Sequence, residues 1–161
     1  MKQNIYDDES FFYPYLNLRK KSLGLNDVLE IPAFRSLLPD LTGKEILDLG
    51  CGFGQACKWY VAQGAKNVVG IDISHKIINI AKKEFCDDRI IYECIPMEDV
   101  NFTNEKFDLV FSSLAFHYIA DYNTLTKKIS TWLKPDGFFN FFTGAPTCNS
   151  KKGAYGLVLD C

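Results

Sequence analysis

One short segment constrains this chain more than any other: the apolar run ILDL (residues 46–49) leads directly into the glycine-rich turn GCGFG (residues 50–54). The apolar run is typical of a buried strand, and the amphipathic residues after the turn indicate a helix. Glycine has no Cβ, so it allows a tight turn and lets a ligand approach the backbone. The free N–H groups at the start of the following helix suit a polar or anionic group. The segment therefore predicts a strand–turn–helix unit that binds a ligand at the turn.

A second segment makes this prediction more specific. The run VVGIDIS (residues 68–74) contains a second apolar strand that ends in Asp72, about twenty residues after the glycine turn. A carboxylate at this place can accept hydrogen bonds from both hydroxyls of a ribose. The alternative is that Asp72 only complements the dipole at the start of the next helix. Together, the turn and the acid favour a ligand that contains a nucleoside.

Apolar and amphipathic stretches alternate from residue 45 onward, which is the pattern of parallel strands joined by crossover helices. Helices are expected from Ser74, which can cap one, and over about residues 54–63 and 122–133. Gly64 is the expected left-handed residue after the first of these, and a turn at residues 134–137 should end the last. Strands are expected at residues 45–49, 67–71, 90–94, 108–112 and 138–142.

Length and composition limit the class of protein. With 161 residues, 47% of them hydrophobic, the chain is long enough for one domain with a core. A net charge of -2 provides no basic field for nucleic acid. No apolar run reaches the roughly 18 residues that span a bilayer, so we expect a cytoplasmic protein without a membrane partner. The six cysteines form no Cys-x-x-Cys pair, which argues against disulfides and against a metal site.

Four segments of the chain resemble class I S-adenosylmethionine (SAM)-dependent methyltransferases, in particular the family that includes the ubiquinone and menaquinone biosynthesis methyltransferases. These segments are residues 47–54 (LDLGCGFG), 69–74, 107–118 and 133–137. The resemblance implies an α/β fold with an open, mostly parallel, Rossmann-like sheet in the order 3-2-1-4-5 and helices on both faces. SAM would lie over the carboxyl ends of strands 1, 2 and 4.

The resemblance also implies which residues bind the cofactor. The amino-acid part of SAM would lie against Asp48, Gly50, Cys51, Gly52 and Ser112. The ribose and the adenine would lie against Asp72, Ile73, Met97 and Glu98. Pro96 stands where the family often has Asp or Asn, so one side-chain contact to adenine is missing from this set.

Two further parts of the chain concern the methyl acceptor. His117 would lie beside the transferring methyl group and could accept a proton from the acceptor, although packing is an alternative role. The N-terminal residues 1–40 resemble the family's helical lid over SAM, while packing of their aromatic rings on the sheet is the equal alternative. The lid residues would be Tyr6, Phe11, Phe12, Tyr15 and Arg19.

We therefore expect a single domain, residues 1–161, that transfers a methyl group from SAM to a small-molecule acceptor. It would consist of the lid, a core at residues 41–143 and an irregular tail at residues 144–161. One alternative is a SAM-binding remnant without activity. Another, less favoured, is an NAD-binding oxidoreductase, because a dinucleotide fingerprint places its third glycine where this chain has Gln55, and the glycine here is Gly54.

The end of the chain is expected to depart from the family pattern. By the resemblance, a helix and two more strands follow strand 5, whereas only residues 143–161 remain here, so we expect a C-terminally truncated sheet without its last two strands. Either the apolar stretch at residues 155–159 folds back as a makeshift strand, or the edge of residues 138–142 self-associates. The sequence favours self-association.

Overall fold

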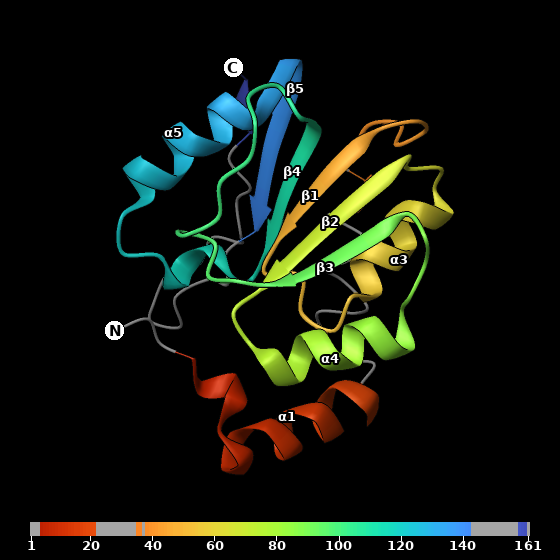
Figure 1. Cartoon of the computed structure of the whole chain (residues 1–161), viewed down its shortest axis with the longest axis vertical. Coiled ribbons are helices and arrows are strands. Elements are labelled where there is room, and N and C mark those ends of the chain that lie inside the picture. The colour runs from red at the N-terminus through yellow and green to blue at the C-terminus, as the bar shows by residue number, and fades with distance from the viewer. Residues whose placement is uncertain (1–3, 22–34, 37, 143–157, 161) are drawn as a thin grey trace, which may run out of the picture.

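A computed structural model of the chain describes residues 4–21, 35, 36, 38–142 and 158–160. These residues form three layers, with a sheet between two layers of helices (Figure 1). Helix α5 (Tyr122–Trp132) covers one face, and helices α3 (Gln55–Ala62) and α4 (His75–Glu84) cover the other.

The sheet has the order β3-β2-β1-β4-β5-β6. Its first five strands are parallel, which confirms the predicted order 3-2-1-4-5. They are β1 (Glu45–Leu49), β2 (Asn67–Asp72), β3 (Ile90–Cys94), β4 (Phe107–Ser113) and β5 (Leu133–Phe142). The direction of winding reverses between β1 and β4, and in open α/β sheets ligands bind outside the carboxyl ends of the strands at such a point.

A short last strand, β6 (Val158–Asp160), differs from the expected irregular tail. It runs antiparallel beside β5, with register pairs from Phe138–Asp160 to Asn140–Val158. Of the makeshift strand predicted at residues 155–159, residues 158 and 159 lie in β6, and residues 155–157 lie outside the described residues. The edge of β5 carries backbone N–H and C=O groups that need partners, and a segment of the same chain supplies them locally.

The predicted helix ends agree with the local chemistry of the structure. The Ser74 hydroxyl accepts a hydrogen bond from the N–H of Ile77 at 3.2 Å, which caps α4. Gly64 follows α3 with a φ of 94°, in the left-handed conformation that glycine tolerates. In α5, Asp121 accepts from the N–H of Thr124 at 3.0 Å. These polar residues fix where each helix starts or stops.

The structure corrects the prediction of a separate turn between α5 and β5. Helix α5 ends at Trp132 and β5 begins at once with Leu133, so residues 134–137 lie inside the strand. The register shifts from Phe107–Leu133 to Leu109–Phe138, which makes these residues a bulge. Lys134 Nζ holds the bulge by hydrogen bonds to Asp108 Oδ2 at 2.9 Å and Glu45 Oε2 at 3.0 Å.

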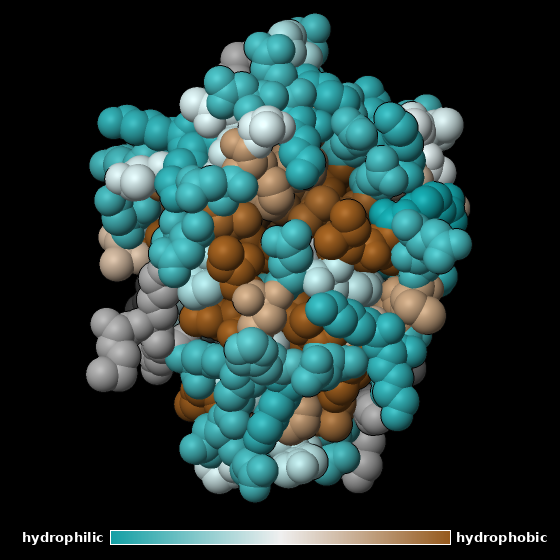
Figure 2. Space-filling view, viewed as in Figure 1, coloured by the Kyte–Doolittle hydropathy of each residue, from teal (hydrophilic) through white to brown (hydrophobic). Residues whose placement is uncertain are grey.

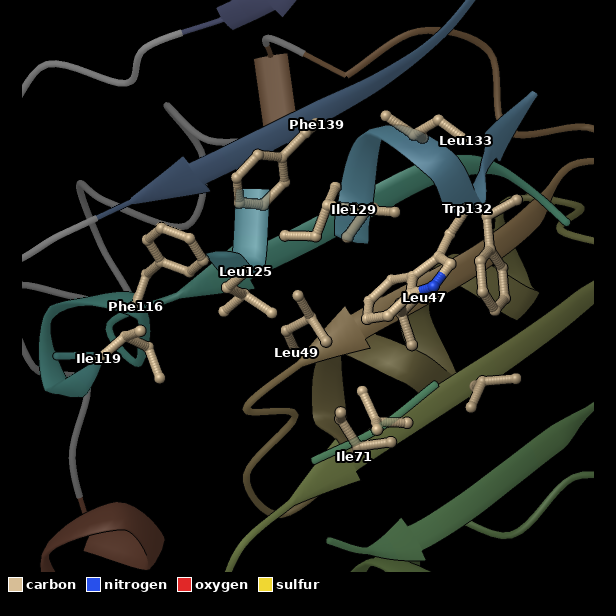
Figure 3. Packing of buried hydrophobic residues seen from close by; sticks show 14 residues of the cluster. Leu47, Leu49, Ile71, Phe116, Ile119, Leu125, Ile129, Trp132, Leu133 and Phe139 are labelled. Carbon is tan, nitrogen blue, oxygen red and sulfur yellow. The ribbon is translucent and has the colours of Figure 1, made fainter. Parts of the chain in front are cut away.

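Two apolar clusters hold the layers together. Figure 3 shows the cluster under α5, where Leu47, Leu49 and Ile71 of the sheet meet Ile129 and Trp132 of the helix. The second cluster packs α3 and α4 on the opposite face. On the face seen in Figure 2, hydrophobic residues gather in the middle and hydrophilic residues surround them. Among the described residues, no helix is long and apolar enough to cross a membrane.

Candidate cofactor site

The glycine turn connects β1 to α3, and its three glycines all have positive φ. The values are 80° for Gly50, 55° for Gly52 and 89° for Gly54. The N–H groups of Gly50 and Cys51 both donate to the carbonyl of Ile71, at 2.8 and 2.9 Å, which ties the turn to the end of β2. A Cβ on Gly50 would collide with Ala115. Position 50 therefore requires glycine both for its conformation and for space.

Asp72 ends β2, and its carboxylate bonds to the glycine turn. The N–H of Gly52 donates to Oδ2 at 3.1 Å and the N–H of Ser74 donates to Oδ1 at 2.9 Å. Burial raises the pKa of Asp72, and these N–H groups oppose that rise. Each carboxylate oxygen has lone pairs for more than one hydrogen bond, so the group can also bind two neighbouring hydroxyls. The predicted ribose residue thus lies beside the predicted turn.

Asp48 lies buried in β1, just before the turn, with 3% of its surface exposed. Burial raises its pKa to about 7; a hydrogen bond from the Cys57 thiol at 3.5 Å opposes this rise, and the charge of Asp72 adds to it. A cation nearby would favour the ionised form of Asp48. The ammonium group of SAM is such a cation.

Cys51 of the turn and Cys57 of α3 lie side by side against Gly70 of β2. Both thiols are free and buried, and a Cβ on Gly70 would lie 3.0 Å from Cys51 Sγ and 2.9 Å from Cys57 Sγ. The hydrogen bond to Cys51, burial and the charge of Asp48 raise the pKa of Cys57 well above its usual value. The two side chains act as small packing groups that require glycine at position 70.

Two of the other predicted residues have clear surroundings. The Met97 methyl group would lie 3.6 Å from a Cβ on Gly50, so Met97 borders the glycine turn, whereas the resemblance implies a place beside the adenine. Ser112 is buried, and its hydroxyl donates to the carbonyl of Leu49 at 2.8 Å, which joins β4 to β1. Only the lone pairs of Ser112 are left for a ligand.

Ile73 and Glu98 engage other parts of the chain through their backbone. The carbonyl of Ile73, directly after Asp72, accepts from Asn4 Nδ2 at 3.3 Å. The carbonyl of Glu98 accepts from Lys128 Nζ of α5 at 2.8 Å. Both side chains are half-buried. Ile73 thus lies where the N-terminal segment meets the sheet, while Glu98 lies against α5.

The described N-terminal segment consists of η1 (Ile5–Asp7) and α1 (Glu9–Lys21), and it packs beside α4 and the glycine turn (Figure 1). The Tyr15 ring stacks on Phe53 of the turn at 5.8 Å, and Tyr6 meets Tyr15 edge-on at 5.3 Å. Burial raises the pKa of Tyr15, and the charge of Asp72 adds to this, against Arg19. The segment thus packs on the glycine turn through the Tyr15 ring.

Other aromatic residues of this segment divide between packing and exposure. Phe12 is buried, but against Phe53 of the turn and Ile77 of α4, and not on the sheet as the packing alternative predicted. Tyr13, by contrast, is 55% exposed. Phe11 stacks on Tyr15 at 5.7 Å. The aromatic set thus fixes the segment on α4 and on Phe53 of the glycine turn.

His117 lies in η3 (Phe116–Tyr118), the short helix that follows β4. Its side chain is exposed, and its ring centroid lies 4.2 Å from that of Tyr118. The hydroxyls of Tyr118 and Tyr6 lie 3.3 Å apart, so η3 touches the N-terminal segment. His117 is therefore next to the residue that joins these two parts of the chain, with its ring accessible to an acceptor.

Sequence reasoning missed two residues of this site. Ala115 packs against Gly50, and the only signal for it is its small size in the segment after β4. Asp7 bonds to the start of α4, 67 to 69 residues away, and no local pattern predicts that contact. Both contacts join segments that are distant in sequence.

The groups at this site fit SAM. Asp72 offers a carboxylate to a ribose, Asp48 offers a buried carboxylate to an ammonium group, and Gly52 has nothing within 4 Å of its missing Cβ, so its side is open. Met97 supplies an apolar wall. Among the described residues, no group of three or more His, Cys, Asp or Glu side chains could hold a metal ion.

An open parallel sheet with a glycine turn after β1 and an acid at the end of β2 defines a Rossmann-like nucleoside-binding protein. Comparison with protein families makes the class more specific, because the model of the methyltransferase domain family matches residues 47–141. The chain belongs to this family, whose cofactor is SAM.

Individual relatives agree with this family. An uncharacterised protein of Haemophilus influenzae is 37% identical over 93% of the chain, and the ubiquinone biosynthesis O-methyltransferase of Nitrobacter winogradskyi is 33% identical over 73% of it. A solved SAM-dependent methyltransferase from Mesorhizobium loti is 40% identical over 74% of the chain, with a TM-score of 0.71. The chain covers only 62%, 44% and 55% of these three proteins, respectively.

Proposed function

We propose that this chain binds SAM and transfers its methyl group to a small-molecule acceptor. The observation that carries the proposal is the Asp72 carboxylate, held by the N–H of Gly52 across a turn that only glycine can form at position 50. The similarity to a ubiquinone biosynthesis O-methyltransferase supports a small acceptor whose oxygen receives the methyl group.

The chemistry is a displacement at the sulfonium. A lone pair of the acceptor forms a bond to the methyl carbon, the carbon–sulfur bond breaks, and its electrons stay on the sulfur of S-adenosylhomocysteine (SAH). SAM supplies the reactive methyl group, so the protein's task is to align the reactants and exclude water. Asp72 would orient the ribose and Asp48 the ammonium end. Gly50, Cys51 and Gly52 would give the amino-acid part access to the backbone.

The N-terminal segment is proposed as the lid of this site. Its rings already contact the turn through Tyr15 and Phe53, and Tyr6 reaches η3 through Tyr118. Buried aromatic rings exclude water and interact favourably with a neighbouring sulfonium cation. The lid would thereby separate the transferring methyl group from solvent.

His117 is proposed to accept the proton that the acceptor loses. Its ring is exposed next to Tyr118, on the segment that follows β4. Replacing it with alanine should leave SAH affinity unchanged, because the ring makes no part of the glycine turn, and should lower turnover. If His117→Ala lowers only thermal stability, the residue is a packing residue.

A cytoplasmic location is likewise part of the proposal and rests on the sequence alone.

Calorimetric titration with SAM, SAH and NAD tests the proposed function. We expect SAM and SAH to bind and NAD not to bind. Tighter binding of NAD than of SAM would favour the oxidoreductase alternative. If SAM binds, incubation with methyl-labelled SAM and a panel of phenols and catechols should transfer the label to one of them. Binding without transfer to any acceptor class would favour the inactive remnant.

A further inference from the structure

The carboxylate of Asp7 joins the N-terminal segment to the start of α4. Its Oδ1 accepts from the Ser74 hydroxyl at 2.6 Å and from the N–H of Lys76 at 3.1 Å. Its Oδ2 accepts from Asn4 Nδ2 at 2.8 Å and from the N–H of His75 at 3.3 Å. Free N–H groups and the helix dipole make the start of α4 a favourable place for a carboxylate.

Ser74 is shared between Asp7 and the cofactor site. Its hydroxyl donates to Asp7, while its backbone N–H donates to Asp72 Oδ1 at 2.9 Å. The same hydroxyl oxygen accepts from the N–H of Ile77 and so caps α4. Ser74 is fully buried, with 0% of its surface exposed. One rigidly held residue therefore contacts the carboxylate of the lid, the carboxylate at the end of β2 and the helix.

Two more contacts fix the segment on either side of Asp7. Asn4 Nδ2, besides its bond to Asp7, donates to the carbonyl of Ile73 at 3.3 Å. Tyr15 stacks on Phe53 of the glycine turn. Burial alone would raise the pKa of Asp7. The hydrogen bonds from Ser74 and from the backbone of Lys76 outweigh burial, so the pKa is lowered and the group is ionised at neutral pH. A charged acceptor makes these hydrogen bonds stronger than neutral ones.

We propose that Asp7 is a positioning residue for the cofactor: it holds the N-terminal segment closed beside Asp72 and, through Ser74, fixes the orientation of the Asp72 carboxylate. This inference rests on the proposed function of the Asp72 site. It means that closing the lid and shaping the ribose contact are one event, because the same serine takes part in both. Binding of the nucleoside should therefore stabilise the docked segment, and undocking should weaken binding by the same factor.

A purely structural role for Asp7 gives a different expectation. In that case Asp7 stabilises α4 and its loss lowers thermal stability without changing SAH affinity in the folded protein. Asp121 provides a matched control, because it caps α5 by accepting from Thr124 at 3.0 Å on the opposite face of the sheet. Its replacement removes a helix cap of the same chemistry from another helix.

The experiment measures SAH affinity by calorimetry in the full chain and in the variants Asp7→Ala, Asp7→Asn and Asp121→Ala. Asp7→Ala removes all four hydrogen bonds and should weaken SAH binding about tenfold or more, as expected for charge-assisted bonds. Asp7→Asn keeps an oxygen that can accept from Ser74, but its amide NH2 would face the donors of Asn4 and His75. Its loss of SAH affinity should therefore be smaller than that of Asp7→Ala. Asp121→Ala should bind SAH like the unchanged chain.

Limited proteolysis gives a second readout. SAH should protect residues 4–21 from cleavage in the unchanged chain and in Asp121→Ala, and should protect them less in Asp7→Ala. If SAH binds the unchanged chain and Asp7→Ala equally well, the inference is wrong while the proposed function stands. If SAH fails to bind the unchanged chain, both are wrong. Should Asp7→Ala fail to fold, an unchanged SAH affinity in Asp7→Asn, together with equal protection, overturns the inference.

Discussion

Two carboxylates lie at the ends of neighbouring strands, but their surroundings give them different properties. Asp48 is buried in β1 and has the Cys57 thiol as a weak donor, so burial raises its pKa to about 7. Asp72 is partly exposed, and two backbone N–H groups stabilise its charge. The first can gain its charge when a cation binds, whereas the second presents lone pairs in a fixed direction. Such a division suits a ligand with an ammonium group and a diol.

Replacing Asp72 with alanine should weaken SAH binding by about 1.5 to 3 kcal/mol, because charge-assisted hydrogen bonds to the ribose are lost. Calorimetry on the folded variant measures the change. Asp87→Ala is a suitable control, since Asp87 is a carboxylate whose bonds go to Arg89 at 3.0 Å and Lys58 at 3.0 Å. An unchanged dissociation constant in folded Asp72→Ala would assign Asp72 to the helix start alone.

The raised pKa of Asp48 predicts a specific dependence of stability on pH. In the unfolded chain the group titrates near 3.8, and in the folded chain near 7. Between these values the folded chain binds more protons than the unfolded one, so its stability falls as pH rises from about 4 to about 7 and is level above that. Compared with Asp48→Asn, which cannot titrate, the unchanged chain should lose on the order of a few kcal/mol over this window.

Urea unfolding of both proteins at a series of pH values between 4.5 and 8 measures this difference. Taking the difference between the two proteins isolates the pH dependence that involves Asp48, including the effect of the Asp72 charge on the pKa of Asp48. SAH and SAM affinity should increase as pH rises through 7 in the unchanged chain, because their ammonium group favours ionised Asp48. A pH-independent difference in unfolding free energy would show that Asp48 is already ionised when the chain folds.

The sequence was most informative at residues whose role depends on their own backbone. Gly50 and Gly52 have the positive φ values that the turn required, and Asp72 stands at the predicted strand end. Ser112 was assigned to the cofactor by resemblance, but its hydroxyl donates to the carbonyl of Leu49. Asp7 carried no signal at all. The roles of Ser112 and Asp7 depend on partners 63 or more residues away, which local patterns do not reveal.

At the level of elements, strands bounded by clear turn residues were predicted best. The bounds of β1 and β3 agree with the expected residues 45–49 and 90–94. The predicted start of β5 at residue 138 was wrong, because Pro135 and Gly137 gave a strong turn signal. That signal is real, but the turn lies inside the strand as a bulge, where a Cβ on Gly137 would lie 3.0 Å from the carbonyl oxygen of Asp108. Pairing with β4 decides whether such a turn precedes or interrupts a strand.

The fit between the glycine turn and Ala115, the residue before η3, can be tested with two glycines of similar conformation. Gly43 has a φ of 73° with nothing within 4 Å of its missing Cβ, whereas Gly50 has a φ of 80° and would collide with Ala115. Gly43→Ala should cost only the left-handed strain of about 1 to 2 kcal/mol. Gly50→Ala should cost clearly more, as measured by urea unfolding. Adding Ala115→Gly should recover part of the excess.

This comparison separates strain from collision. If Gly50→Ala and Gly43→Ala lose the same stability, Gly50 and Ala115 are not packed as closely as the structure indicates. The double variant carries the same left-handed alanine as Gly50→Ala, so any recovery comes from relief of the contact with Ala115. SAH binding should fall in Gly50→Ala even where the protein stays folded, because the added methyl group moves the turn.

For the whole molecule, the cofactor site and the N-terminal segment meet at the carboxyl ends of the parallel strands. The strands β1, β2 and β4 bring the turn, Asp72 and η3 together, and the N-terminal segment closes on them through Asp7 and Tyr15. This arrangement follows from the strand order, since the order reverses between β1 and β4. The acceptor side is not determined in this way. Acceptor pockets depend on lids and late segments, and the chain covers only 44% to 62% of the relatives described above.

The edge of β5 that faces away from β4 is covered by β6, and this pairing bears on the association of whole chains. Strand β6 pairs with residues 138–140 of β5, and a chain stopped at Gly144 would lack it. The exposed edge would then present unpaired backbone groups beside Phe138 and Phe139, which favours pairing with a second chain. Light scattering after size exclusion should show a larger mass for the shortened chain than for the full chain. Replacing Val158 and Leu159 together with proline should act in the same direction without shortening the chain. N–H groups of successive strand residues point to opposite sides, so one of the two donors removed faces β5. A monomer of equal stability in all three proteins would show that β6 does not protect the edge of β5.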